Sequence, residues 1–175
     1  MNKRVEAALN DQIQKEASSS QYYLAMASWA ETQGLSGTAN FMYMHSDEER
    51  LHMLKLIKFV NERGGTAIIS GLENPPSDFS SLSNVFSLLL EHELKVTESI
   101  NNLVDVCLQE KDYSTHNFVQ WYVSEQLEEE ALARTILDKV NMIGEDKAGL
   151  YMLDRDLENS TINATTVSQE GNGPA

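Results

Sequence analysis

Glu49 and His52 are the first residues to indicate chemistry, because they interrupt an apolar helical stripe. They stand three positions apart in HSDEERLHML, residues 45–54, a segment with the spacing of an α-helix. Met42 lies seven positions before Glu49 and Leu56 lies seven positions after it. Both polar side chains therefore share a face with core-type residues. A carboxylate and an imidazole on such a face cost several kcal/mol unless something pairs with them.

Three further glutamates occupy the same kind of position in other segments. Each has an apolar residue seven positions before it and another seven positions after it: Glu16, Glu93 and Glu129. Taken singly, each is also explained as a residue at the rim of an amphipathic helix. Brought together without a counter-charge, the four carboxylates would repel each other and most would protonate. A pair of divalent cations removes this repulsion, and carboxylates with one imidazole suit iron, manganese or zinc.

The spacing of these residues is typical of di-iron carboxylate bundles. In those proteins two helices each supply one Glu, and two helices each supply a Glu-x-x-His pair. This sequence has one such pair, Glu49 and His52, whereas Gln126 and Glu129 stand at the same spacing in a later segment. We therefore expect an asymmetric two-metal site in which one metal position has fewer ligands.

Composition and charge narrow the class of protein. The chain has 175 residues, 41% of them apolar, which is enough for one domain with a buried core. Acidic residues outnumber basic ones 27 to 13, for a formal net charge of −14. This charge argues against nucleic acid as a partner and favours small cations. The acidic excess is also explained by solubility alone.

Cysteine usage and the lack of targeting signals predict a cytoplasmic protein. Cys107 is the only cysteine, so an intrachain disulfide and a Cys-x-x-Cys metal site are excluded. The start, MNKRVEAALNDQ, has no apolar region typical of a secretory signal. No apolar run approaches the ~20 residues that span a bilayer, so no membrane contact is expected.

The segments that carry the four glutamates are long and helical, and no segment reads as a strand. The long segments are 5–33, 38–63, 82–110 and 114–143, and a shorter helix is expected at 146–158. Residues 66–81 contain Pro75 and Pro76, which forbid a continuous helix. In extended form this connection spans roughly 50 Å, more than the roughly 42 Å of a helix of ~28 residues.

A connection of this length makes the second and third helices parallel. We therefore predict an all-α, ferritin-like four-helix bundle with one long crossover between the second and third helices and a short fifth helix. The ferritin-like domain is expected to occupy residues 1–158. Residues 159–175 are polar and have almost nothing to bury, so a disordered C-terminal tail is expected there.

Four motifs make the sequence similar to the non-haem bacterial ferritins over nearly its full length, to about residue 158. They are EASSSQYY at 16–23, DEERLH at 47–52, EHE at 91–93 and QWYVSEQLEEE at 120–130. The resemblance implies an iron-storage protein and ferroxidase, which oxidises Fe(II) with O2 or H2O2. It would deposit a ferric oxide-hydroxide mineral inside a homo-oligomeric cage of twenty-four subunits.

The same resemblance implies a ligand set for a pair of irons. Glu16, Glu49 and His52 would hold the first iron. Glu49, Glu93 and Glu129 would hold the second, with Glu49 bridging the two metals.

A third iron site is also implied by the resemblance. It would use Glu48, Glu125 and Glu128, with Glu129 shared. Each of the first three is adjacent in sequence to a ligand or near one, and points away from the first two metals. From spacing alone, a solvated acidic face is an alternative interpretation of these residues.

Two further residues are given roles by the resemblance. Gln126 would hydrogen-bond to the ligands. Tyr23 matches a tyrosine beside the centre that can give up an electron, although a packed core tyrosine explains it equally well. Trp121 is read as a core residue.

The sequence also departs from relatives of this family. Bacterioferritins place a haem-ligating Met directly after the bridging Glu, whereas Arg50 stands there in this chain, so no haem is expected. The stretch STHNFV, residues 114–119, lacks the carboxylates that line the threefold channel of animal ferritins. Three histidines lie outside the ligand positions and are read as surface or boundary residues: His45, His92 and His116.

Three rival functions have sequence features against them. A rubrerythrin-like peroxidase would need a second Glu-x-x-His pair and an iron domain held by four cysteines. This chain has Gln126 and Glu129 in place of a second pair, and Cys107 is its one cysteine. A DNA-protecting mini-ferritin would keep its ligands at a dimer interface and often has a basic tail. This chain is acidic instead, and its expected ligands all lie within one subunit. A purely structural ferritin subunit would not need the complete ligand set.

Overall fold

Five α-helices make up the described fold. The computed structural model describes the backbone of residues 1–170 and the side chains of residues 1–159. The helices are α1 (Lys3–Thr32), α2 (Ser36–Glu62), α3 (Leu82–Gln109), α4 (Tyr113–Ile143) and α5 (Lys147–Glu170). The predicted all-α, ferritin-like fold is confirmed. The first four helices begin and end within two residues of the predicted bounds.

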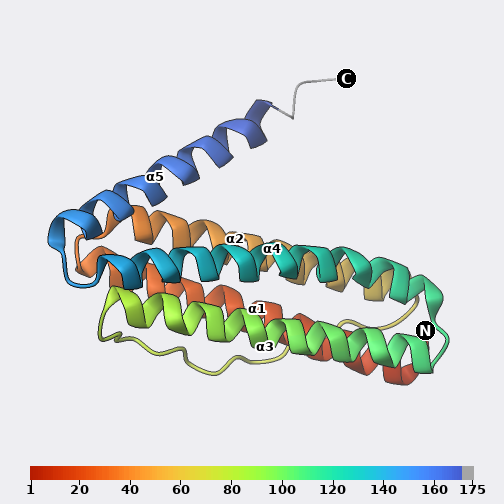
Figure 1. Ribbon diagram of the computed structural model, residues 1–175. Coiled ribbons are helices and arrows are strands. Elements are labelled where there is room, and N and C mark those ends of the chain that lie inside the picture. Colours follow the sequence, from red (N-terminus) through yellow and green to blue (C-terminus); the bar gives the residue numbers. More distant parts are fainter. Residues whose placement is uncertain (171–175) are drawn as a thin grey trace.

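Helices α1 to α4 form an antiparallel bundle with one long crossover (Figure 1). α1 lies against α2, α3 lies against α4, and α1 also lies against α3. Residues 63–81 run back along the bundle from the end of α2 to the start of α3, so these two helices are parallel. This arrangement faces the middles of the four helices toward one another.

Local sequence signals place the helix ends. The side chains of Asn2, Ser81 and Asp112 accept hydrogen bonds from backbone N–H groups in the first turns of α1, α3 and α4. These bonds satisfy donors that a helix start leaves unpaired. Gly34 and Gly64 follow α1 and α2 with φ angles of 75° and 73°, a conformation that glycine adopts at little cost.

Two apolar clusters fill the bundle and leave a polar section between them. One cluster includes Met26, Met42, Phe86 and Ile136, and the other includes Leu9, Leu56, Ile100 and Tyr122. In α1, Glu16 falls between Ile13 of one cluster and Tyr23 of the other. The glutamates of α2, α3 and α4 fall between the two clusters in the same way. The apolar core therefore holds the four acids at one level of the bundle.

α5 leaves one end of the bundle and projects at an angle to it (Figure 1). Its first half is fastened to the start of α2 by the Asp154 carboxylate. This group accepts hydrogen bonds from the backbone N–H groups of Gly37 at 3.0 Å and Thr38 at 2.7 Å. A Cβ atom on residue 37 would lie 1.8 Å from the backbone oxygen of Asp154. Only glycine therefore permits this approach of the two helices.

α5 is longer than the sequence predicts. The predicted end is residue 158, but the helix continues to Glu170. A disordered tail is therefore not what the structure shows for residues 159–170, while residues 171–175 lie outside the described part. The reason is that no Gly or Pro occurs between residues 159 and 170, so nothing there stops the helix. Across the described residues, no helix combines the length and apolarity needed to cross a membrane.

Candidate metal centre

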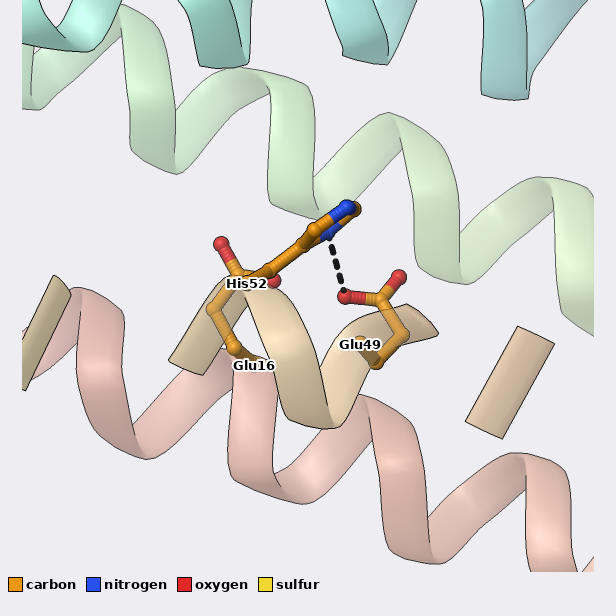
Figure 2. A group of neighbouring side chains, drawn as sticks. All are labelled: Glu16, Glu49 and His52. Carbon is orange, nitrogen blue, oxygen red and sulfur yellow. Dashed lines mark ion pairs between the residues drawn. The ribbon is translucent and has the colours of Figure 1, made fainter. Parts of the chain in front are cut away.

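Glu16 of α1 meets Glu49 and His52 of α2 inside the bundle (Figure 2). One possible ligand atom from each of the three side chains lies within 4.8 Å of the others. The residues are buried, with exposed fractions of 1%, 4% and 8% in that order. The Nδ1 atom of His52 lies 3.3 Å from Oε2 of Glu49. The three residues that the resemblance assigns to the first iron are thus side by side.

Glu93 of α3 is held by two donors from the neighbouring helices. The Tyr23 hydroxyl donates a hydrogen bond to its Oε1 atom. Nε2 of Gln126 donates to its Oε2 atom at 2.5 Å and to its backbone oxygen at 3.1 Å. All three residues are buried. Gln126 and Tyr23 therefore both contact a carboxylate that is expected to hold the second iron.

Glu129 of α4 pairs with His45 of α2, and this corrects the reading of His45 as a surface or boundary residue. His45 is only 4% exposed, and its Nε2 atom lies 3.5 Å from Oε2 of Glu129. Its Nδ1 atom lies 2.9 Å from the carbonyl oxygen of Phe41. Burial opposes protonation of the imidazole, but Glu129 raises the pKa of His45 above its ordinary value. The sequence contains a signal for the burial of His45, because His45 stands four positions before Glu49 and so lies on the same helical face.

Burial and mutual repulsion favour the protonated form of the clustered carboxyl groups. Burial is the main cause that raises the pKa of Glu49 to about 8, and repulsion from Glu93 and Glu129 adds to it. Burial also raises the pKa of Glu93 to about 7, again with repulsion from Glu129. The pKa of Glu16 lies well above its ordinary value because of burial and the nearby Glu49. A cation at this cluster would compete with protons near neutral pH.

The residues present fit a pair of divalent metal ions. Oε2 of Glu49 is buried and accepts no hydrogen bond in the described structure, although Nδ1 of His52 lies 3.3 Å from it. A buried acceptor without a hydrogen bond costs free energy. A cation beside this oxygen would supply the missing positive charge. Carboxylate oxygens with a single imidazole are donors that suit iron, manganese or zinc.

Glu48 links two further groups at the edge of the centre. Possible ligand atoms within 4.8 Å of one another come from His45, Glu48 and Glu129 in one group, and from Glu48, His52 and Glu125 in the other. Glu128 belongs to neither of these groups, and its side chain is exposed. Glu48 and Glu125 therefore lie beside the buried centre, whereas Glu128 lies on the surface of α4.

Trp121 is 38% exposed, so its reading as a core residue is wrong. Its ring meets the imidazole of His52 nearly edge-on, with 5.2 Å between ring centroids. Nζ of Lys55 lies 3.1 Å from the centroid of the indole. The indole thus covers one side of His52 and is itself covered by a cation. Both contacts join α4 to α2, so helical spacing within one segment could not predict them.

Comparison with known proteins agrees with this fold. The family described as "Ferritin-like domain" matches residues 6–143. A "Probable bacterial non-heme ferritin-like protein" of Haemophilus influenzae is 46% identical over 164 residues, covering 94% of this chain and 99% of that protein. A "Bacterial non-heme ferritin" of Campylobacter jejuni is 44% identical over 162 residues, covering 93% of this chain and 97% of that protein.

A solved structure shows the same similarity. An open-pore ferritin from the archaeon Archaeoglobus fulgidus matches with a TM-score of 0.89 and 44% identity, covering 90% of this chain and 98% of that chain. The chain therefore belongs to the ferritin family, and within it to the non-haem ferritins of the bacterial type.

Proposed function

We propose that this protein stores and detoxifies iron, and that each subunit is a ferroxidase that converts Fe(II) to Fe(III). The observation that carries the proposal is the buried group of Glu16, Glu49 and His52, in which one oxygen of Glu49 accepts no hydrogen bond. Glu93 and Glu129 lie close enough to Glu49 to repel it. Membership of the ferritin family and the names of the relatives support iron storage.

Glu49 is the proposed bridge between two bound Fe(II) ions. Glu16 and His52 complete the first site, and Glu93 and Glu129 complete the second. Each Fe(II) loses one electron, and one O2 takes up the two electrons and two protons to give H2O2. Because both electrons leave together, superoxide is not released. Carboxylates suit the hard Fe(III) product, and the apolar clusters on both sides limit side reactions.

Gln126 and Tyr23 are proposed to act through Glu93. The Gln126 amide orients the carboxylate, as outer partners of a metal ligand do. Burial and the charge of Glu93 raise the pKa of Tyr23 well above its ordinary value, so its phenol stays protonated. If the phenol gives up one further electron to the oxidant that is being reduced at the centre, its proton passes to Glu93 along their hydrogen bond.

The proposed storage function predicts a cage that loads iron far beyond the capacity of its metal centres. Metal-free protein should have the mass of twenty-four subunits in solution. After aerobic additions of Fe(II), the iron content should exceed the two or three ions that the proposed sites of each subunit can hold. Light scattering and iron analysis of the purified cage measure both quantities. A protein that binds its first irons but accumulates no more would contradict the storage function.

A third, weaker cation site is proposed at the edge of the centre. Glu48 is its central residue, because it belongs to two groups that also contain His45, Glu125 and Glu129. Glu128 is exposed and belongs to neither group, so it is proposed to bind the third cation less directly than Glu48 does. A site built mostly of partly exposed carboxylates should bind Fe(II) weakly and exchange it quickly, so it would affect later turnovers and not the first.

Variants of Glu48 and Glu128 test this third site. Glu48→Ala and Glu128→Ala should both leave the first fast oxidation nearly intact, because neither residue belongs to the proposed pair of iron sites. Glu48→Ala should slow the later additions, and Glu128→Ala should slow them less. The measurement is a series of repeated Fe(II) additions followed by stopped-flow absorbance. If both variants match the wild type in every addition, these acids form an ordinary solvated face.

A further inference from the structure

A series of three hydrogen bonds runs from the surface of the bundle to Glu16. Nζ of Lys15 donates to the Ser99 hydroxyl at 2.7 Å. The Ser99 hydroxyl donates to Oε1 of Gln12 at 2.6 Å. Nε2 of Gln12 donates to Oε1 of Glu16 at 2.9 Å. Three of these residues lie on α1 and Ser99 lies on α3, so the series joins two helices of the bundle.

The direction of every bond in this series is fixed by chemistry. A lysine ammonium can only donate, so the Ser99 oxygen must accept from Lys15. The single hydroxyl proton of Ser99 is then available for the oxygen of the Gln12 amide. The amide must therefore point its nitrogen, and not its oxygen, toward Glu16. Gln12 is 1% exposed, so water cannot readily replace any of these partners.

The series determines which oxygen of Glu16 is available to a metal. Oε1 accepts the Gln12 bond. Oε2 is not held by this series. A carboxylate held by one oxygen in this way is restricted in rotation and presents its other oxygen in a fixed direction. Without the donor, the buried side chain of Glu16 would lose this restraint.

The cationic end of the series is open to solvent. Lys15 is exposed, and it lines a surface pocket of about 350 Å³ between α1 and α3. The charged group therefore keeps its hydration while it orders a buried serine and a buried amide. The cost of burying a lysine charge is avoided.

We propose that Gln12 is a positioning residue of the metal centre, and that Ser99 and Lys15 fix the orientation of its amide. Gln12 would hold Glu16 so that the carboxylate binds the first metal through one oxygen. This inference rests on the proposed function, because it assumes that Glu16 is a metal ligand. It adds a residue and a direction of hydrogen bonding that the ligand set itself does not contain.

Binding of Co(II) to the metal-free cage tests this proposal without any turnover. Co(II) reports both affinity and, through its visible absorption, the geometry of its ligands. Gln12→Leu and Ser99→Ala should each weaken the first Co(II) site about 10-fold or more, as expected for loss of an outer partner of a ligand. Both should change the absorption of the first Co(II) and leave the affinity of the second site nearly unchanged.

Matched variants separate positioning from ordinary packing. Ser99→Thr keeps the hydroxyl and should restore first-site affinity and the wild-type spectrum. Ser19→Ala removes a buried serine hydroxyl of α1 that contacts His92 and the backbone oxygen of Lys15 but not Gln12 or Ser99. It should leave both readouts unchanged, because the Lys15 ammonium and the Gln12 amide keep their bonds. If Gln12→Leu does not assemble, the comparison of Ser99→Ala with Ser99→Thr decides the question alone.

The two possible failures give different results. If wild type binds no Co(II), or if Glu16→Ala binds it as wild type does, the proposed metal centre is wrong. If Glu16→Ala loses the first site while Ser99→Ala and Gln12→Leu match wild type in affinity and spectrum, the centre stands and the positioning role is overturned. Equal weakening of both Co(II) sites in Ser99→Ala would also overturn it, because that result indicates general loosening of the bundle.

Discussion

Glu49→Ala should abolish the fast oxidation of Fe(II) while leaving the cage assembled. Glu49 is the proposed bridge, and it carries the buried oxygen that has no hydrogen-bond partner. Loss of an outer partner of a metal ligand commonly costs 10- to 100-fold, so loss of the bridge itself should lower the initial rate by more than about 100-fold. Assembly should survive, because removing a buried acid also removes repulsion from the bundle.

Stopped-flow absorbance of the first Fe(II) addition under O2 measures this effect. Asp47→Ala is the matched control, since Asp47 is an exposed acid on the same turn of α2 and should leave the rate unchanged. Light scattering of the same samples checks that both variants remain assembled. A wild-type initial rate in an assembled Glu49→Ala cage would place the oxidation elsewhere in the protein.

Helical spacing was sufficient to predict both the fold and the four central acids. Each acid interrupts an apolar stripe, and spacing of seven residues is a property of one helix that sequence displays directly. The crossover was predicted because Pro75 and Pro76 prevent a helix in residues 66–81, and because this segment in extended form is longer than one helix of the bundle. The end of α5 was mistaken because polarity was taken as a sign of disorder, whereas helix ends depend on residues that stop a helix, and the first of these is Gly171.

The residues that support the acids were harder to predict. Gln12 stands four positions before Glu16, and His45 stands four positions before Glu49, so both lie on the correct faces. Spacing shows that such polar residues are near a site, but the donor and the acceptor of each bond depend on a residue from another helix. Ser99 on α3 decides the orientation of Gln12, and no pattern within α1 contains that information.

Divalent metal should stabilise the folded protein more strongly as pH rises, and Glu93 should account for part of this effect. The pKa of Glu93 is raised to about 7 by burial and by Glu129, whereas an unfolded glutamate has a pKa of about 4.3. Between these values the folded state binds more protons than the unfolded state, so stability of the metal-free protein falls as pH rises. Below about pH 4.3 both states are protonated and the difference disappears.

Glu93→Gln removes this titration and should therefore change stability in a pH-dependent way. At about pH 8 the variant should melt a few degrees above wild type when metal-free, and at about pH 5.5 the difference should shrink. The gain is limited because Glu93 accepts bonds from both Tyr23 and Gln126, and an amide can accept at only one of its two terminal atoms. With Zn(II), which binds only the folded state, wild type should gain more than the variant, which has lost one ligand.

Thermal scans at about pH 5.5 and about pH 8, with and without Zn(II), measure all of these differences. Glu91→Gln is the matched control on α3. Glu91 is exposed, and Lys95 lowers its pKa through a hydrogen bond and charge attraction, so neutralising it should not raise the melting temperature. Two results would count against the clustered centre: no Zn(II)-dependent shift in wild type, or a Zn(II) shift that shrinks as pH rises. The sign of the pH dependence matters most, because buried carboxylates that exchange protons for metal must bind metal better where protons are scarce.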